Sequence, residues 1–349
     1  MKKDLVSILI PNYNYSRYLG NCLDSVLSQT YDNIEVVFRD NCSSDNSLDI
    51  AVEYKEKFAA KGIAYSFAKN KYNVGSASNS VRCLRECEGR YLIYLSSDDA
   101  LKPDFVEKCV KIFHQYPDVG MVMTHRDEMD ENGKIKQTIP FYNQSCVIDG
   151  EAQAAVFMMA GIAVPSQCMF SWAHYSIAMN GRTAPFRTCG DWYNNFVMSC
   201  YSDIAYIKEP LCLYRVHSGN ETSASEDDLS GLMEHYNLIN AFRDLAQGFK
   251  MTRAFDRHEE AIEKLGDMCL RYAVKMLKNN KNKIADNYLR IAPIFKESIV
   301  KDEKYVKLSE ATTLKGLELQ NAILAYEKQY TVERTISYDP PAEHIPLSI

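Results

Sequence analysis

The sequence predicts an α/β fold in which a mainly parallel sheet is flanked by helices and followed by an all-helical C-terminal region. In residues 4–124, short apolar runs rich in Val, Ile and Leu alternate with segments whose apolar residues recur every three or four positions. Strands that alternate with helices in this way are typical of a parallel sheet covered on both faces. Residues 229–334 instead have an almost wholly helical pattern. We therefore expect an α/β domain in residues 1–228, a helical region in residues 229–334 and an extended tail in residues 335–349.

The 349-residue chain has the composition of an ordinary globular protein, with 46% apolar and 25% charged residues. A net charge of −6 argues against a general nucleic-acid-binding protein. No run approaches the roughly 18 apolar residues of a membrane span, and the first residues lack the pattern of a signal peptide. The eleven cysteines are scattered and include no CxxC pair, so we expect reduced thiols rather than disulfides or a zinc site. These features together favour a cytoplasmic protein.

Five strands are expected in the first half of the chain, each a short apolar run bounded by turn residues. They cover residues 6–10, 34–38, 63–68, 91–95 and 119–124. Pro11 ends the first strand, and residues 39–45, which are rich in Asp, Asn and Ser, form a turn after the second. The helices between the strands are indicated by apolar residues that share one face. They fall within residues 19–27, 48–58, 77–84 and 106–113.

The pattern becomes less regular after residue 125. Asn132 and Gly133 indicate a hairpin turn, and residues 154–163 suit a buried helix. Further along the chain we expect a loop, a helix that begins near Asp191, two short strands and a polar loop. These elements are assigned to residues 181–190, 191–198, 204–207, 211–216 and 218–228.

Two adjacent carboxylates, Asp98 and Asp99, follow the strand expected at residues 91–95. In α/β sheets, ligands bind where the strands end at their carboxyl side. Two carboxylates placed there would be costly to desolvate unless a cation lay between them. A divalent metal with oxygen ligands, itself carrying phosphates, is one interpretation. The alternative is that both residues cap the helix that begins near Pro103.

Three further polar residues lie where strands end or helices begin. Asp40 follows the second strand and could accept hydrogen bonds from a nucleobase or ribose, or could cap the turn after it. Asp191 could be a general base or a helix N-cap. His217 follows the strand at residues 211–216 and could join carboxylates around manganese or a similar ion, or could be structural. The residues alone leave these alternatives open.

Six segments, in order along the chain, resemble the motifs of the inverting family 2 glycosyltransferases with the GT-A fold, a Rossmann-like architecture. They are residues 6–14, 39–47, 73–79, 89–99, 190–192 and 210–217. The resemblance covers roughly residues 4–222 and leaves the helical region uncovered. It implies a transferase that uses a nucleotide-diphosphate sugar, most commonly a UDP-sugar, and a divalent metal, Mn²⁺ or Mg²⁺. The acceptor would be a hydroxyl of a glycan or of a lipid-linked saccharide, as in polysaccharide biosynthesis.

The resemblance also implies a role for each matching residue. Asp191 would be the general base, and Asp99 would bind the metal with His217 nearby. The donor would be bound by a set of residues from four of the matching segments. This set comprises Pro11, Tyr13, Asn14, Asp40, Asn79, Ser97 and Asp98. Within it, Asp40 would hold the nucleobase and Asp98 the ribose or sugar.

Four positions depart from the family pattern. Ser96 replaces an acidic residue near the donor, Ser78 a common arginine, Cys42 a turn glycine, and Gly190 the acidic residue before the base. Ser96 and Ser78 keep open a second interpretation, a catalytically degenerate scaffold that binds a nucleotide sugar. A sugar nucleotidyltransferase is a third, although no Gly-rich basic phosphate loop follows the first strand.

The helical region has several interpretations. It could only cover the α/β domain, or it could bind a second copy of the chain as a homodimer, a partner or a membrane surface. An apolar stripe in residues 305–330 is more often used for packing than for dimerisation. Lysines in residues 275–283 could meet anionic lipid head groups at the inner face of a membrane, although a solvated face is the simpler explanation.

Overall fold

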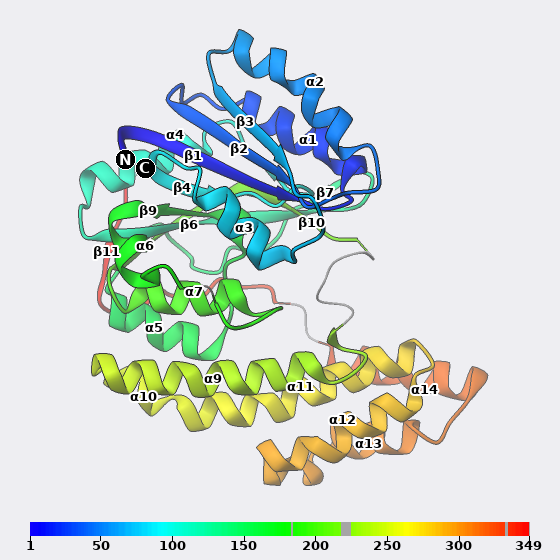
Figure 1. The fold of residues 1–349 in the computed structure, drawn as a ribbon. Helices are drawn as coiled ribbons and strands as arrows, with labels where there is room; N and C mark the ends of the chain where they lie inside the picture. Colours follow the sequence, from blue (N-terminus) through cyan, green and yellow to red (C-terminus); the bar gives the residue numbers. More distant parts are fainter. Residues whose placement is uncertain (183, 218–224, 332–333, 349) are drawn as a thin grey trace.

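The computed structural model of the protein describes residues 1–182, 184–217, 225–331 and 334–348. A mixed sheet with helices on both faces forms one part of the molecule, and a layer of further helices lies beneath it (Figure 1). The strands of the sheet are β1 (Lys2–Asn12), β2 (Ile34–Asp40), β3 (Ala64–Lys69), β4 (Gly89–Tyr94), β5 (Ala100–Leu101), β6 (Val119–Met129), β7 (Ile135–Lys136), β8 (Cys146–Ile148), β9 (Cys168–Ser171), β10 (Asp203–Arg215) and β11 (His344–Pro346). Their main path across the sheet is β11-β8-β10-β6-β9-β4-β1-β2-β3.

The helices divide into a group that covers the sheet and a C-terminal group. The first group is α1 (Ser16–Leu27), α2 (Ser47–Ala60), α3 (Ser76–Leu84), α4 (Phe105–Gln115), α5 (Gly150–Met159), α6 (Trp172–Met179) and α7 (Gly190–Ser199), with the 3-10 turn η1 (Pro165–Gln167). The second is α9 (Ser230–Phe249), α10 (Thr252–Asp256), α11 (His258–Lys278), α12 (Asn282–Phe295), α13 (Glu303–Ala311) and α14 (Gly316–Tyr330), with the 3-10 turn η2 (Glu297–Lys301).

The expected α/β architecture is confirmed in the first half of the chain. β1 pairs in parallel with both β2 and β4, and β2 pairs in parallel with β3. Because side chains alternate along a strand, Ile8 and Ile10 of β1 enter the core beneath α1, α2 and α4, while Leu9 enters the core on the other face. β1 continues through Pro11 to Asn12, which lies opposite Asp40 at the end of β2. The carboxyl ends of the parallel strands therefore meet at one edge.

The second half differs from the prediction in three places. The strands expected at residues 204–207 and 211–216 form one strand, β10, because register shifts on either side of Pro210 keep both parts paired with β6. The helix expected at residues 154–163 is α5, which starts earlier because Asp149 caps it: the carboxylate accepts the Ala152 N–H at 3.1 Å. β9 and α6 have no counterpart in the prediction, since a four-residue strand leaves little periodicity.

The other expected elements have mixed outcomes. The hairpin at Gly133 is present, with β6 and β7 antiparallel around it. The loop expected at residues 181–190 separates α6 from α7. Most of the polar loop expected at residues 218–228 lies outside the described residues.

The C-terminal helices share a hydrophobic core with the helices beneath the sheet. Phe242 of α9 stacks on Phe196 of α7, with ring centroids 4.1 Å apart and an interplanar angle of 9°. The tail then returns to the α/β part of the chain, where β11 pairs antiparallel with β8. In the portion of the chain that the structure describes, no helix combines the length and the apolar character that a membrane span requires.

Candidate active site

Asp40 ends β2 at the edge where the parallel strands meet, and its side chain is fully buried. One carboxylate oxygen accepts a hydrogen bond from Asn12 Nδ2 at 3.1 Å, and the other accepts from the backbone N–H of Ser43 at 2.8 Å. These bonds fix the turn after β2. Within that turn, Cys42 has φ +65°, so it adopts the left-handed conformation that glycine favours. Cys42 therefore has the backbone conformation that a glycine would favour at this position.

The other residues expected to bind the donor lie in different surroundings. Pro11 lines a large cavity described below, whereas Tyr13 is 44% exposed. Asn14 accepts the Ser44 N–H on Oδ1 at 2.9 Å, which ties the loop after β1 to the turn after β2. Asn79 is buried and serves as a brace: its Nδ2 donates to the Arg39 carbonyl at 3.0 Å and its Oδ1 accepts from Asn70 at 2.7 Å.

Asp98 and Asp99 follow β4, and Ser97 is buried just before them. Asp99 is almost fully buried; its Oδ1 accepts the backbone N–H of Arg215 at 2.8 Å and its Oδ2 accepts Ser166 Oγ at 2.6 Å. Burial, together with the charge of Asp98, raises the pKa of Asp99 to about 7. His217 Nε2 lies 3.0 Å from Asp98 Oδ2. The structure therefore pairs the imidazole of His217 with Asp98, which was expected to bind the donor, rather than with Asp99, the other expected metal ligand.

The chemistry of this group fits a divalent cation. Carboxylate oxygens and an imidazole are ligands that suit Mn²⁺ or Mg²⁺. Two neighbouring carboxylates repel each other when both are ionised, and a bound cation would reduce that repulsion. Among the described residues, no group of three His, Cys, Asp or Glu side chains is placed to hold a metal ion. A cation beside Asp98, Asp99 and His217 would therefore need further ligands from a diphosphate or from water.

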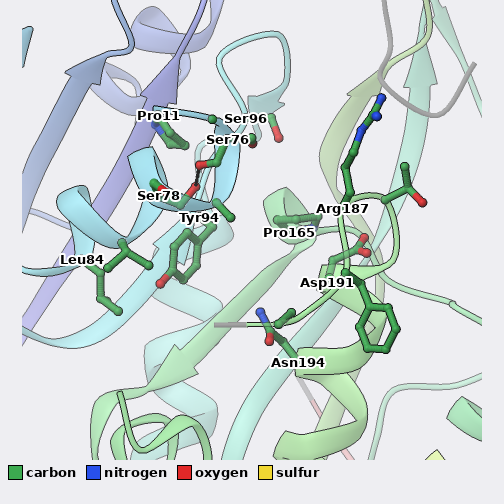
Figure 2. A pocket seen from close by; sticks show the side chains of 18 of the residues that line it. Pro11, Ser76, Ser78, Leu84, Tyr94, Ser96, Pro165, Arg187, Asp191 and Asn194 are labelled. Atoms are coloured by element: carbon green, nitrogen blue, oxygen red, sulfur yellow. Dashed lines mark hydrogen bonds between the residues drawn. The ribbon is translucent and has the colours of Figure 1, made fainter. Parts of the chain in front are cut away.

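A cavity of about 690 Å³ lies between α3, the end of β4 and the start of α7. Pro11 and Ser96 line it from the side of the parallel strands, and Asp191 lines it from the first turn of α7. Figure 2 shows Asp191 and Arg187 on one side of this cavity, across from Ser78, Tyr94 and Leu84. Asp40, Asp98 and Asp99 are not among its described lining residues. The cavity thus adjoins the strand edge without including its acidic cluster.

Asp191 is held at the start of α7 by its immediate surroundings. Its Oδ1 accepts the backbone N–H of Trp192 at 2.8 Å, and burial raises the pKa of its carboxyl to about 6. The Trp192 ring is fixed in turn, since its Nε1 donates to the Phe157 carbonyl at 2.6 Å and its ring meets Phe242 of α9 edge-on. A carboxyl that faces a cavity and whose pKa is raised by burial is suited to accept a proton from a substrate hydroxyl.

Two residues of the site, Arg215 and Ser166, were not predicted from the sequence. Arg215 lies within the last of the six motif segments, and its side chain donates to the carbonyls of Asp98 and Asp130 at 2.7 and 2.8 Å. Ser166 joins the carboxylate of Asp99 to the backbone N–H of Ser96, which it accepts at 3.0 Å. The motif containing Arg215 could have indicated that residue. Ser166 lies in a stretch whose pattern gives no signal.

Comparisons with known proteins agree with this geometry. The family model described as "Glycosyl transferase family 2" matches residues 7–168. An uncharacterized glycosyltransferase of Nostoc is 30% identical over 225 residues, which cover 62% of this chain and 66% of that protein. The chondroitin synthase of Escherichia coli is 38% identical over 131 residues, which cover 38% of this chain and 18% of that protein. The chain therefore spans less than two thirds of the length of these relatives.

Solved structures give the same fold. Staphylococcus aureus TarS 1–349 in complex with UDP-GlcNAc superposes with a TM-score of 0.56 at 15% identity, over 88% of this chain and 91% of that chain. The mannosyltransferase PcManGT from Pyrobaculum calidifontis, in complex with GDP-Man and Mn²⁺, gives a TM-score of 0.53 at 15% identity, over 93% of this chain and 87% of that chain. These two likenesses establish a GT-A glycosyltransferase fold. The family model matches the α/β part of the chain over residues 7–168, and the relatives that resemble the chain are named as glycosyltransferases or glycan synthases.

Proposed function

We propose that the protein is an inverting glycosyltransferase that moves a sugar from a nucleotide-diphosphate sugar to a hydroxyl of a glycan or glycoconjugate acceptor. The observation that carries this proposal is the shared cavity: Asp191, a carboxyl with a pKa raised to about 6, faces the same space as Pro11 and Ser96 at the strand edge. A base and a donor-binding edge on one cavity are what a direct transfer between two bound substrates requires.

The donor would bind along the strand edge. Asp40 would accept hydrogen bonds from the nucleobase, and Pro11, Tyr13 and Asn14 would border it. Asp98 would meet the ribose or sugar. The buried serine before Asp98 and the brace formed by Asn79 would hold this edge in shape. We favour a UDP-sugar as donor; in support, TarS was solved with UDP-GlcNAc, whereas PcManGT was solved with GDP-Man.

The acceptor would enter from the side of α7. Asp191 would take the proton from the acceptor hydroxyl as that oxygen attacks the anomeric carbon from the face opposite the diphosphate, which inverts the configuration. Asp99, with His217 nearby, would hold a divalent cation, Mn²⁺ or Mg²⁺. When bound, this cation would supply positive charge against the diphosphate leaving group. The presence of Mn²⁺ in PcManGT supports this assignment.

A thermal-shift assay tests the donor side of the proposal. UDP, GDP, dTDP, CDP and ADP are each added with and without Mn²⁺. A nucleotide at about 100 times its Kd should add roughly 2.7 kcal/mol to the free energy of unfolding. We expect a shift with UDP that depends on Mn²⁺ and is lost in Asp99→Ala. Asp244→Ala, which removes an exposed carboxylate of α9, should keep it. No metal-dependent shift with any nucleotide would contradict the proposal.

Transfer assays separate the proposal from its rivals. Asp191→Asn should keep UDP binding and lose sugar transfer. A scaffold would bind the nucleotide with no turnover in either form. A nucleotidyltransferase would instead release pyrophosphate from UTP and a sugar 1-phosphate.

A further inference from the structure

The cavity is lined by more basic than acidic residues. Among its described lining residues, Arg182 and Arg187 are basic and Asp191 is the acidic one. Both arginines belong to the loop between α6 and α7, and both are exposed. Among the described residues, other arginines form ion pairs, but Arg182 and Arg187 do not. The entrance on the side of Asp191 thus carries two exposed cations, and the charge of Arg187 also contributes to lowering the pKa values of Glu234 and Asp228.

The loop that carries these arginines is anchored by the helical region. Glu234 of α9 accepts the backbone N–H groups of Arg187 and Thr188 at 3.3 and 2.8 Å, and Thr188 Oγ at 2.6 Å. Its carboxylate is thereby engaged with the loop backbone and with Thr188. A loop fixed in this way presents Arg187 at a defined place and lowers the ordering cost of binding.

The rest of this side of the cavity suits a sugar. Asn194 lies one turn after Asp191 on α7, and its Oδ1 is buried without a hydrogen-bond partner among the described residues. Figure 2 shows Asn194 at the cavity beside Asp191. Tyr94, which Figure 2 shows across from Asp191, and Tyr175 also line the cavity, and their hydroxyls lie 3.1 Å apart. An amide and aromatic rings are groups that bind sugar hydroxyls and the apolar faces of sugar rings.

We infer that the acceptor of this transferase is an anionic saccharide, whose carboxylate or phosphate is bound by Arg182 and Arg187 while Asn194 orients the sugar next to Asp191. This inference rests on the proposed function and names the substrate class of the same site. Guanidinium groups bind carboxylates and phosphates in a bidentate manner, so the two anions share one recognition chemistry.

The donor diphosphate is the competing ligand for these arginines. In the proposed function, the diphosphate lies near Asp98, Asp99 and His217, which are not among the described lining residues of the cavity. The arginines lie instead on the loop that leads into α7 and its base, Asp191. If the two arginines bound the donor diphosphate, substituting them would weaken UDP binding. If they bind the acceptor, UDP binding should be unchanged, so the experiment below also measures UDP binding.

The test is a ligand-observed NMR titration of the full chain in the presence of UDP and Mn²⁺. The probes are three β-linked disaccharides of equal length that end in glucose, glucuronate or glucose 6-phosphate. We expect at least one charged probe to bind roughly five- to thirtyfold more tightly than the neutral one, as for two partly screened ion pairs. The advantage should shrink between about 50 mM and about 500 mM salt. Whether glucuronate or glucose 6-phosphate binds more tightly decides between a carboxylate and a phosphate.

Arg182→Gln/Arg187→Gln should bind all three probes equally and should keep the UDP-dependent thermal shift. Arg290→Gln, at an exposed position of α12, is the matched control and should behave as wild type. Equal binding of the three probes by wild type would overturn the inference, as would an advantage that survives in the double variant. A loss of UDP binding in the double variant would assign the arginines to the donor and also overturn it. Failure of the proposed function would be seen separately, as the absence of any UDP-dependent shift in wild type.

Discussion

Asp191 combines two influences that set its protonation: burial, which raises its pKa to about 6, and the Trp192 N–H, which stabilises its ionised form. A general base acts only when ionised. We expect kcat at saturating donor and Mn²⁺ to fall about tenfold per pH unit below pH 6 and to level off above it. Asp191→Asn should lower kcat by roughly 10²- to 10⁴-fold and remove the acid limb. A limb that persists unchanged in this variant would assign it to another group.

The same pKa makes a prediction about stability. An aspartate in an unfolded chain has a pKa of about 3.9, so between about pH 4 and pH 6 the folded chain binds more protons at Asp191 than the unfolded chain does. The contribution of Asp191 to stability is therefore lost as the pH rises through this window. Asp191→Asn should be more stable than wild type by about 1–3 kcal/mol at pH 8, with little difference at pH 4. Chemical denaturation at both pH values measures this, and equal stability at pH 8 would contradict it.

Cys42 is strained by its left-handed backbone at φ +65°. In this conformation a residue with a Cβ destabilises the folded state by roughly 1–2 kcal/mol. Glycine avoids this strain but loses about 0.5–1 kcal/mol of stability because its unfolded chain is more flexible. Cys42→Gly should therefore raise the free energy of unfolding by about 0.5–1 kcal/mol. Cys42→Ala keeps the Cβ and is the matched control, with little change expected. Urea titration distinguishes the two, and equal effects would remove backbone strain as the cause.

Individual residues of the site were predictable to different degrees. Asp40, Asp98 and Asp191 could be found because Asp40 ends a strand, Asp98 lies four residues after one and Asp191 lies in the first turn of a helix. The pairing of His217 with Asp98 could not, because spacing along the chain does not decide between two adjacent carboxylates. Ser166 was also out of reach, since its hydrogen bond to Asp99 joins positions 67 residues apart.

At the scale of elements, α9 supports the loop that leads to the base. Glu234 accepts three hydrogen bonds from Arg187 and Thr188. Glu234→Ala should loosen this loop and lower kcat/KM for the acceptor roughly tenfold, because a small displacement of a positioning group has a large effect on rate. Donor binding, measured by the UDP shift, should not change.

Two variants control for this prediction. Glu234→Gln keeps a carbonyl oxygen that can accept from the loop and should retain much of the activity. Glu263→Ala removes an exposed carboxylate from α11 and should behave as wild type. Equal losses for donor and acceptor in Glu234→Ala would indicate general destabilisation instead of loop positioning.

Elements with a clear period were predictable, and those shaped by tertiary contacts were not. β1, β2 and β4 are buried and read as apolar runs. β10 was divided in the prediction at Pro210, because the sequence does not reveal that β6 accommodates the register shifts there. β9 and α6 together span only residues 168–179, so neither repeats its pattern for long enough to be identified.

At the scale of the whole molecule, the helical pattern of residues 229–334 predicted apolar faces without identifying what covers them. The structure provides the cover: Phe242 stacks on Phe196, and Trp192, next to the base, meets Phe242 edge-on. The hydrophobic core is continuous from the underside of the sheet into the C-terminal helices. The region that resembles no family motif is therefore structurally joined to the proposed site.

A continuous core predicts that both regions unfold together. Phe242 is fully buried, so Phe242→Ala should lower the free energy of unfolding by about 3–5 kcal/mol. Because Trp192 contacts Phe242, fluorescence is read in a Trp192→Phe background. The remaining tryptophan, Trp172 of α6, then reports on the α/β part, while circular dichroism reports on helices throughout. The two signals should shift by the same amount and keep coincident transitions.

The matched control is Leu324→Ala on α14, where the side chain is 64% exposed and the expected change is within about 0.5 kcal/mol. If the C-terminal helices formed an independent module, Phe242→Ala would shift the circular dichroism transition and leave the tryptophan transition in place. Coincident transitions would instead mean that a substitution in α9 affects the stability of the helix that holds Asp191. The C-terminal helices would then be part of the folding unit on which the proposed transfer depends.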